Sequence, residues 1–480
     1  MVGHIKIGAP DTAPGTAARR TVPYSATMTG QDGSAPTPAP PPQARPGPLA
    51  GLLVADFSRV LAGPYCTMLL ADLGADVIKV ESPAGDDTRR WTPPAAPDGV
   101  STYYLAINRN KRSVALDLND ETDLKLARTL ASRADVFVEN FKPGGLARFA
   151  LDYESVSAAN PRIVYASISG FGSGAGQDLP GYDLMVQAMS GLMSLTGAPD
   201  GPAYRAGISV FDVIAGLHTT IAILAALNHR AVSGQGQQLE ASLMASALSG
   251  MVNQTSAYAA GGVVPFRMGN AHPSVYPYEP FPTADGDLVI AVGNDAQFRK
   301  LCEILGAPNL GHDPLFATNP ARTGNREQLR ALLIGLLAAR PAAEWFDALI
   351  AAGVPCGPIN TVDAGIAFAR RIGLDPIVTA GEGAAARPGI RHPVTFSLTP
   401  PSYPLPPPAL DEHGDQVRAW LANQLSRTAH VLPHVPAAGT PSGATRPARA
   451  AARRGAWRPS SVRYARLCRN FRLRHSGRES

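Results

Sequence analysis

The stretch GLLVADFSRVLAGPYCTMLLADLGADVIKV, residues 51–80, predicts the fold class. It begins with a short apolar run at 51–57 that is typical of a buried strand. A loop at 58–64 leads into a helical pattern at 65–75, and a second strand follows directly at 76–80. Strand, loop, helix and strand in this order form the repeating unit of a parallel sheet covered by helices.

The same order continues downstream, with strands expected at 113–118, 135–140 and 162–168 and a helix at 120–134. This pattern predicts a doubly wound α/β domain, in which ligands bind beyond the carboxyl ends of the strands. The loop at 58–64 lacks the G-x-G-x-x-G fingerprint, and no Walker A sequence occurs, which argues against an NAD, FAD or P-loop enzyme.

Residues 205–230, RAGISVFDVIAGLHTTIAILAALNHR, predict a long and largely buried helix. Their apolar residues recur at three- and four-residue steps, which is the spacing of one helical face. Asp212 is expected in the first turn, where the free N–H groups and the helix dipole favour an ionised carboxylate. From this stretch alone, Asp212 is either a capping residue or a catalytic anion, because aspartate is also a preferred cap.

The rest of the chain predicts a second, smaller α/β domain. A strand at 237–240 and a helix to about residue 262 complete the first part, and a proline- and glycine-bearing linker follows at 263–282. The smaller unit has a strand from Asp287 and helices at 295–305, from Arg326 and at 341–352. Extended chain at 372–408 then returns to the first domain, and a helix at 415–426 ends the body. We therefore expect a large domain at 48–262, completed by 372–426, and a linker with the small domain at 263–371.

Both ends of the chain differ from this body in composition. Residues 1–47 are rich in proline and predict a disordered tail. Residues 427–480 contain twelve Arg, no Lys and one acid, a charge of +11, and also predict disorder. Such a tail can contact polyanions or can be an adventitious extension. The second reading is favoured, and nucleic-acid binding is not the expected function.

No secretory signal is apparent, and no run approaches the roughly 18 apolar residues of a membrane span. Arg19 and Arg20 faintly resemble a transit peptide, but the prolines there oppose an amphipathic helix. The four cysteines have no zinc or C-x-x-C spacing and are expected to be reduced thiols. These features predict a cytoplasmic protein with no metal.

Four basic residues in loops are candidates for binding phosphate groups: Lys111, Arg112, Lys142 and Arg148. Phe141, beside Lys142, offers an aromatic face for an adenine ring. A solvated basic surface explains the same residues equally well.

Taken together, the stretches resemble the class III CoA-transferase family, which includes formyl-CoA, carnitine and succinyl-CoA:dicarboxylate CoA-transferases. The resemblance runs from about residue 48 to 425. Its markers are DFSRVLAGPYCTMLLADLGADVIKVE, GDDTR, NRNKRSVALDL, ADVFVENFKPG, SGFG, GYDLMVQAMSGLMSLTG, RMGNAHPSVYPYEPFPTADG and DEHGD.

The resemblance implies an interlocked homodimer with a Rossmann-like large domain and a small α/β domain joined by long linkers. It implies that Asp212 is the nucleophile and that CoA thioesters are substrates, with no permanently bound cofactor. The CoA-contacting positions that it implies are Leu61, Ala62, Ser82, Leu116 to Asn119, Asn140, Phe141, Lys142, Arg148 and Leu179 to Tyr182. Acyl-CoA and a free carboxylic acid, here a small dicarboxylate, are the implied partners.

Substrate positions implied by the resemblance are Asp183, Arg267, His272 and Glu279. The racemase branch of the same superfamily carries a histidine where this chain has Tyr182. A tyrosine near its ordinary pKa is a poor partner for two-sided proton transfer. The sequence therefore favours CoA transfer over racemisation, which stays an alternative.

Overall fold

The computed structural model describes residues 46–430, and side chains up to residue 425. Its centre is a six-stranded sheet in the order β3-β2-β1-β4-β5-β6, in which all neighbours are parallel. The strands are β1 Leu53–Asp56, β2 Asp76–Glu81, β3 Lys111–Ala115, β4 Val136–Glu139, β5 Val164–Ser169 and β6 Gln237–Ser242. The strand order reverses between β1 and β4, the place where doubly wound folds bind ligands. The predicted parallel α/β sheet is confirmed.

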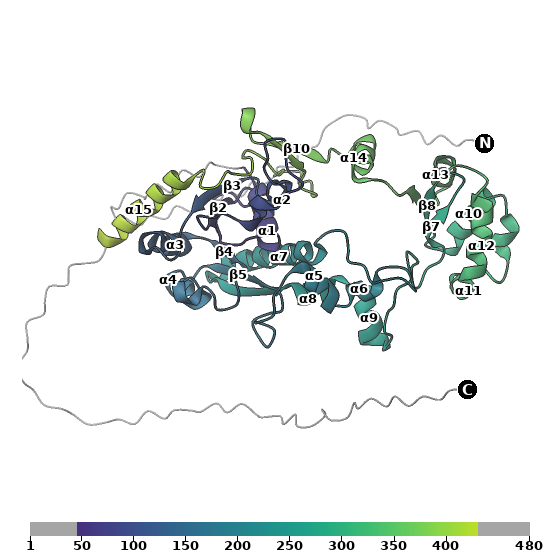
Figure 1. Cartoon of the computed structure of the whole chain (residues 1–480), viewed down its shortest axis with the longest axis horizontal. Helices are drawn as coiled ribbons and strands as arrows, with labels where there is room; N and C mark the ends of the chain where they lie inside the picture. Colours follow the sequence, from purple (N-terminus) through teal and green to yellow (C-terminus); the bar gives the residue numbers. More distant parts are fainter. Residues whose placement is uncertain (1–45, 431–480) are drawn as a thin grey trace, which may run out of the picture. The chain divides into compact units, whose positions relative to one another are not determined.

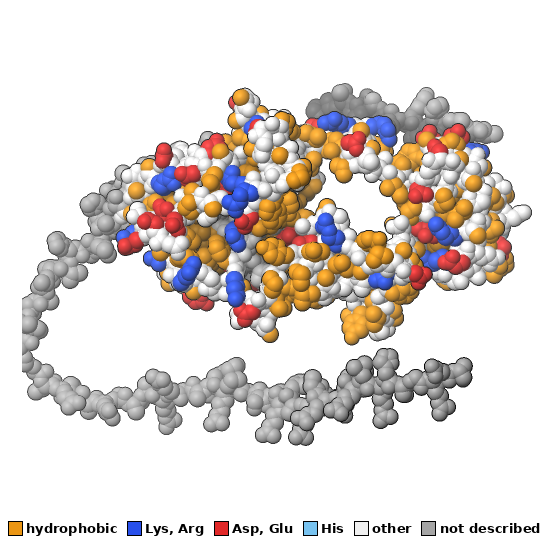
Figure 2. Space-filling model, viewed as in Figure 1, with side chains coloured by type: hydrophobic (Ala, Val, Ile, Leu, Met, Phe, Trp, Pro, Cys, Tyr) orange, Lys and Arg blue, Asp and Glu red, His pale blue; other side chains and the backbone are white. Residues whose placement is uncertain are grey.

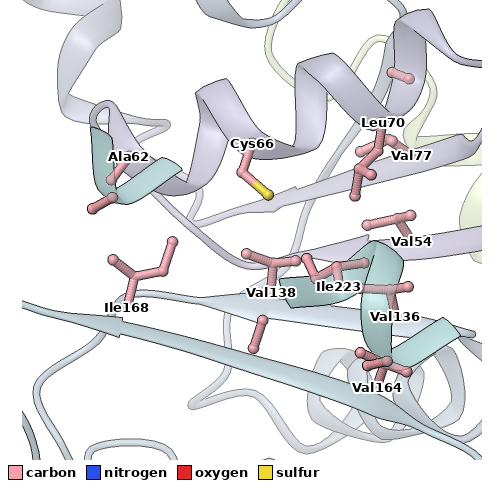
Figure 3. Close-up of a cluster of buried hydrophobic side chains, with 14 of the residues drawn as sticks. Val54, Ala62, Cys66, Leu70, Val77, Val136, Val138, Val164, Ile168 and Ile223 are labelled. Carbon is pink, nitrogen blue, oxygen red and sulfur yellow. The ribbon is translucent and has the colours of Figure 1, made fainter. Parts of the chain in front are cut away.

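Helices cover both faces of this sheet because alternate residues of each strand point to opposite sides. Val54 and Val136 pack on one side with α1 Ala62–Asp72, α7 Val210–Ser233 and α8 Leu243–Gly250. Figure 3 shows Cys66 and Leu70 of α1 facing Val54 and Val138 across this core. Their neighbours Ala55 and Phe137 pack on the other side with α3 Glu121–Arg133, α4 Tyr153–Ala159 and α15 Gly414–His430 (Figure 1).

Helix α7 is the long helix that the sequence predicts, but the prediction that it is largely buried is wrong, because Leu217, Ile221 and Leu224, which recur at the helical spacing, are exposed. Its buried side chains, including Phe211, Ala215, Thr219 and Ile223, recur every four residues, so one face of the helix packs against the core. By length and hydropathy, α7 also meets the criterion for a membrane-spanning helix, among the residues described. The prediction that no segment has the length and hydropathy of a membrane span is therefore wrong. One face of α7 is nevertheless buried in the core, as in the core helix of a globular domain.

The chain returns to the sheet near its end. The backbone N–H of Ala115 on β3 donates to the Asp411 carboxylate at 2.8 Å, and the N–H of His413 donates to the Ser113 carbonyl at 3.0 Å. Val417 and Leu421 of α15 are fully buried in the core on that face. The last helix therefore completes the first core.

A second core surrounds a three-stranded antiparallel sheet of β7 Tyr278–Pro282, β8 Asp287–Ala291 and β9 Cys356–Pro358. Helices α10 Asp295–Ile304, α12 Arg326–Leu337 and α13 Ala342–Ala351 contribute its buried side chains. The remaining elements are α2 Thr102–Ile107, α5 Asp183–Met189, α6 Leu192–Leu195, α9 Val252–Gly261, α11 Asn319–Gly324, α14 Val362–Arg371, β10 Ile377–Ala380, β11 Arg387–Ile390 and the short 3₁₀ turns η1 Asp87–Arg90, η2 Ala147–Phe149, η3 Pro308–His312 and η4 Gly383–Ala385.

Several predicted boundaries are wrong in detail. The expected linker at 263–282 ends in β7, and the extended return at 372–408 contains the β10–β11 hairpin. The single helix expected before residue 262 is two helices, since Val252 at the start of α9 has a positive φ of 37°. Helix α15 continues to His430, past the predicted start of the basic tail. The tails at 1–45 and 431–480 lie outside the described residues, and the domain boundaries stay predictions.

We predict that Gly216→Ala destabilises the fold. Gly216 lies on α7 where it crosses α1, and a Cβ atom there would stand 2.7 Å from the Ala62 carbonyl oxygen. Backbone must move to accommodate that contact, at a cost of about 1–3 kcal/mol. Gly335→Ala in α12, where a Cβ meets nothing within 4 Å, is the matched control and is expected to stabilise by up to about 1 kcal/mol. Urea unfolding of both variants tests this, and equal effects would contradict it.

Candidate active site

Asp212 lies partly buried in the first turn of α7, as expected, and lines a cavity of about 370 Å³. We call this the Asp212 cavity. Its lining contains seven of the positions expected to contact CoA: Ala62, Asn140, Phe141, Lys142, Leu179, Pro180 and Gly181. The other walls come from loops that follow β4 and β5, so the cavity lies at the carboxyl ends of the strands, where this class of fold places its ligands.

The side chain that caps α7 is Asp183, from the first turn of α5. Its Oδ1 accepts the backbone N–H of Phe211 at 2.8 Å and that of Asp212 at 3.2 Å. The Ser209 side chain, at the position that usually caps a helix, makes no capping bond. The first N–H groups of α7 therefore serve the carboxylate of Asp183, and Asp212 is not the capping residue.

Gln187, one turn along α5, holds Asp183 in place. Its amide nitrogen donates to Asp183 Oδ2 and, at 3.1 Å, to the Ile208 carbonyl. Its amide oxygen accepts the Ala206 N–H at 2.8 Å. Asp183 and Gln187 are both buried. Together they fix the segment that leads into α7, and so fix the position of Asp212.

Burial and the negative charge of Asp183 raise the pKa of Asp212 from 3.8 to about 7. The expectation that the helix terminus favours the ionised form is therefore wrong. The terminal N–H groups that would stabilise the anion are bonded to Asp183, which in addition places a like charge beside it. A carboxylate with a raised pKa is a stronger base and nucleophile than an ordinary one.

A second cavity of about 210 Å³ adjoins the first, and Phe141 lines both. We call it the Arg148 cavity. It contains six further positions that the sequence associates with CoA: Ser82, Leu116, Asp117, Leu118, Asn119 and Arg148. Arg59 also lines it, and its guanidinium lies 5.9 Å from the ring centre of Phe141. The structure thus brings the predicted CoA positions into two neighbouring cavities.

Two of the four predicted phosphate-binding residues are not available to a ligand. Lys111 is fully buried and pairs with Asp56 at 3.1 Å, while the buried Arg112 pairs with Asp76. Lys142 and Arg148 are exposed, so they remain candidates; Lys142 pairs with Asp178 at 2.8 Å. The sequence does not distinguish the two buried residues from the two exposed ones, because burial depends on which elements cover each face of a strand.

The expected substrate residues other than Asp183 lie elsewhere. Arg267 and Glu279 line a third cavity of about 430 Å³ with Arg326 and Arg330, and the Glu279 carboxylate is 3.1 Å from Arg330. His272 packs its ring against Tyr278, with 5.2 Å between ring centres. These side chains do not line the Asp212 cavity.

Two of the predicted CoA positions differ in exposure. Leu61 precedes α1 and is buried, whereas the Tyr182 side chain is 66% exposed and does not line the Asp212 cavity.

Among the described residues, no group of three His, Cys, Asp or Glu side chains is placed to hold a metal ion. Burial raises the pKa of the Cys66 thiol to about 12, which disfavours a thiolate nucleophile.

Tyr103, which the sequence did not single out, belongs to the same region. Burial raises the pKa of Tyr103, and the negative charges of Asp212, Asp183 and Asp86 add to this effect, whereas the nearby Ser209 side chain opposes it. Its ring contacts Trp91, with centres 5.1 Å apart. In the sequence Tyr103 is one of two adjacent tyrosines at the start of a short helix, so no local pattern distinguishes it. Only the fold brings it to Asp212.

A family model described as CoA-transferase family III matches residues 49–414. The chain belongs to the class III CoA-transferase family. This confirms the resemblance drawn from the sequence, and the chain is an enzyme of the CoA-transferase type.

Relatives of this class III CoA-transferase agree with that assignment. It is 44% identical to the succinate–glutarate CoA-transferase of Agrobacterium fabrum, over 80% of this chain and 98% of that protein. It is 39% identical to the succinyl-CoA:glutarate CoA-transferase of Mus musculus, over 76% of this chain and 84% of that protein. A crystal structure of a CAIB/BAIF family protein from Brucella suis matches with a TM-score of 0.71 and 43% identity. The match covers 78% of this chain and 100% of that one.

We predict that Asp212→Asn stabilises the transferase, and does so more at high pH. The pKa of Asp212 rises from 3.8 to about 7 on folding, so its ionisation disfavours the folded state increasingly between those values. An amide removes this cost; the gain should be near zero at about pH 4 and reach at most about 4 kcal/mol above pH 7. Thermal unfolding at about pH 5 and about pH 8 measures it. Asp375→Asn, in an exposed ion pair, is the control; a pH-independent gain at Asp212 would contradict the prediction.

Proposed function

We propose that this transferase moves CoA from an acyl-CoA donor, such as succinyl-CoA, to a small dicarboxylic acid, with Asp212 as the covalent carrier. The observation that carries the proposal is the position of Asp212. It is a partly buried carboxylate in a cavity that shares Phe141 with the cavity of Ser82, Leu116 and Arg148. A ligand extending from the second cavity into the first would bring its end to Asp212.

The reaction proceeds by two exchanges at carbonyl carbon. The Asp212 carboxylate attacks the carbonyl carbon of the donor thioester and forms a C–O bond. The C–S bond breaks, CoA leaves as a thiolate, and a mixed anhydride between Asp212 and the donor acyl group remains. The thiolate then attacks the aspartyl carbonyl and releases the donor acid, which leaves CoA bound to Asp212 as a thioester. The acceptor carboxylate repeats these steps in reverse and frees Asp212. Each step is nucleophilic covalent catalysis with no net proton change.

A carboxylate suits this chemistry because its acyl derivatives are as activated as those of the substrates, so that no intermediate is much more stable than the others. Asp183 supports the nucleophile in two ways. Its bonds to the Phe211 and Asp212 N–H groups fix the first turn of α7, and its charge raises the pKa of Asp212. Both effects favour attack by an anion that is poorly stabilised before reaction.

The acceptor class follows from the relatives, whose names specify succinate, glutarate and mesaconate as substrates. Arg267 remains our proposed contact for the distal carboxylate, because guanidinium groups bind carboxylates in a two-pronged geometry. Glu279 is occupied by its contact with Arg330, so we assign it a supporting role for that arginine. His272 also remains a proposed substrate contact. Its ring nitrogen Nδ1 already accepts the Ser274 N–H.

We propose that the active form is a homodimer. Apolar side chains remain exposed on α7, α8 and α9, where Figure 2 shows hydrophobic side chains gathered over α8 and α9. They include Ile221, Leu248, Val252 and Tyr258, with exposures of 64%, 44%, 67% and 65%. Exposed apolar faces of this kind are typical of protein interfaces. Light scattering of the full chain should give a dimer mass, and Ile221→Glu should shift it toward monomer; a monomeric wild type that transfers CoA would contradict the proposal.

The test of function is transfer from succinyl-CoA to a panel of glutarate, mesaconate, oxalate and acetate, followed by chromatography of the CoA products. We expect transfer to the dicarboxylates, and loss by at least about 10³-fold in Asp212→Ala, because that variant lacks the carrier. Mass spectrometry of the intact wild-type protein should show a CoA adduct that maps to Asp212. Asp375→Asn should transfer at the wild-type rate.

The pH profile gives a second measurement of the same carrier. Since Asp212 must be ionised to attack, kcat/KM should rise with pH through an apparent pKa of about 7. Undiminished transfer by a folded Asp212→Ala dimer would refute the role of Asp212. Solvent deuterium entering the α-carbon of an acyl-CoA without any acceptor acid would instead indicate racemisation.

A further inference from the structure

The loop that joins β1 to α1 connects the two cavities described above. Ser58 and Arg59, at its start, line the Arg148 cavity, and Ala62, at its end, lines the Asp212 cavity. Val60 stands between them. The path of the backbone at Val60 therefore bears on how a ligand held in the Arg148 cavity meets the nucleophile in the Asp212 cavity.

Val60 has a backbone conformation that its side chain disfavours. Its φ is 67°, in the left-handed region, which a β-branched residue adopts rarely and at a cost. Such a conformation persists only where the surroundings impose it, and it occurs most often at functional sites. The contacts that impose it here can be named.

A fully buried ion pair holds the loop at Val60. The Asp86 carboxylate accepts the Val60 N–H in a long, two-pronged bond of 3.3 and 3.4 Å. The Lys79 ammonium lies 2.9 Å from the same carboxylate and donates to the Ser58 carbonyl at 3.0 Å. Both charged side chains are 1% exposed. One pair thus fixes the loop on both sides of Arg59.

Three more contacts fix the remainder of the loop. The Asn140 side chain bonds both the N–H and the carbonyl of Arg59, at 2.9 and 2.7 Å. The Asp56 carboxylate accepts the Ser58 N–H at 3.0 Å, and the buried Lys111 ammonium donates to the Pro64 carbonyl at 2.9 Å. The two buried lysines come from strands β2 and β3, so the sheet itself sets the position of the loop.

We propose that Lys79 and Asp86 are positioning residues for CoA transfer, and that they act by holding Val60 in its left-handed conformation so that the acyl end of the ligand reaches Asp212. This inference rests on the proposed function. Lys79 and Asp86 also line the Arg148 cavity, but their side chains are only 1% exposed and bond to the loop. The role that we assign to them is therefore to hold the loop, not to contact the ligand. A small displacement of reacting groups lowers the rate of the chemical step more than it lowers binding.

The test compares steady-state transfer by three full-chain variants. Lys79→Met with Asp86→Leu removes both charges together, a replacement that buried pairs commonly tolerate without loss of stability. We expect kcat to fall on the order of 10- to 100-fold, with a much smaller change in KM for the acyl-CoA, because Phe141 and Arg148 remain in place. Adding Val60→Gly should restore several-fold of the lost kcat, since glycine adopts a positive φ without support.

Val60→Pro is the third variant, and it leaves the buried charges untouched. Proline cannot adopt a positive φ and has no N–H for Asp86, so kcat should fall here also. Asp375→Asn, remote from this network and exposed, should match the wild type.

Wild-type kcat in the folded Lys79→Met, Asp86→Leu variant, or in Val60→Pro, would overturn the inference. A defect that Val60→Gly does not relieve would overturn it too, because a general loss of structure is not repaired by a more flexible residue. A wild-type protein with no CoA exchange would refute the proposed function, whereas normal exchange in the variants would refute this inference alone.

Discussion

The contact between the Asp183 carboxylate and the first N–H groups of α7 determines the character of the site. It anchors the helix that carries Asp212, and it takes up the positive end of that helix, so the neighbouring carboxylate cannot use it. The same charge then adds to burial in raising the pKa of Asp212 to about 7. One interaction stabilises the fold and leaves the nucleophile poorly stabilised, a common relation between structure and reactivity in enzymes.

Much of the fold follows from the sequence because hydrophobic period and chain order are local signals. The strand–helix alternation from residue 51 gave the parallel sheet, and the spacing in residues 205–230 gave α7 with Asp212 in its first turn. Motif resemblance supplied the positions that the structure gathers around Phe141. Their positions could be predicted from the sequence because each lies beside a recognisable strand end or helix start.

What the sequence did not reveal depends on contacts between distant segments. Asp183 caps a helix 28 residues away, and Tyr103 reaches Ser209 from a different element. Lys111 and Arg112 look like exposed cations in NRNKRS, yet both are buried. Lys111 bonds to Asp56 and to the Pro64 carbonyl of α1, and Arg112 pairs with Asp76 of the neighbouring strand β2. Neither burial nor the pKa of Asp212 has a local signature, since both are set by what packs above the sheet.

The late return of the chain has a consequence for biosynthesis. Strand β3 is complete at Ala115, but Asp411, Val417 and Leu421, which cover that part of the sheet, are about 300 residues further along the chain. At translation rates of about 5–20 residues per second, the ribosome needs roughly 15–60 s to make that distance. During this interval an apolar face of the sheet is uncovered in the nascent chain, which is the period when a chaperone would be of most use to this protein.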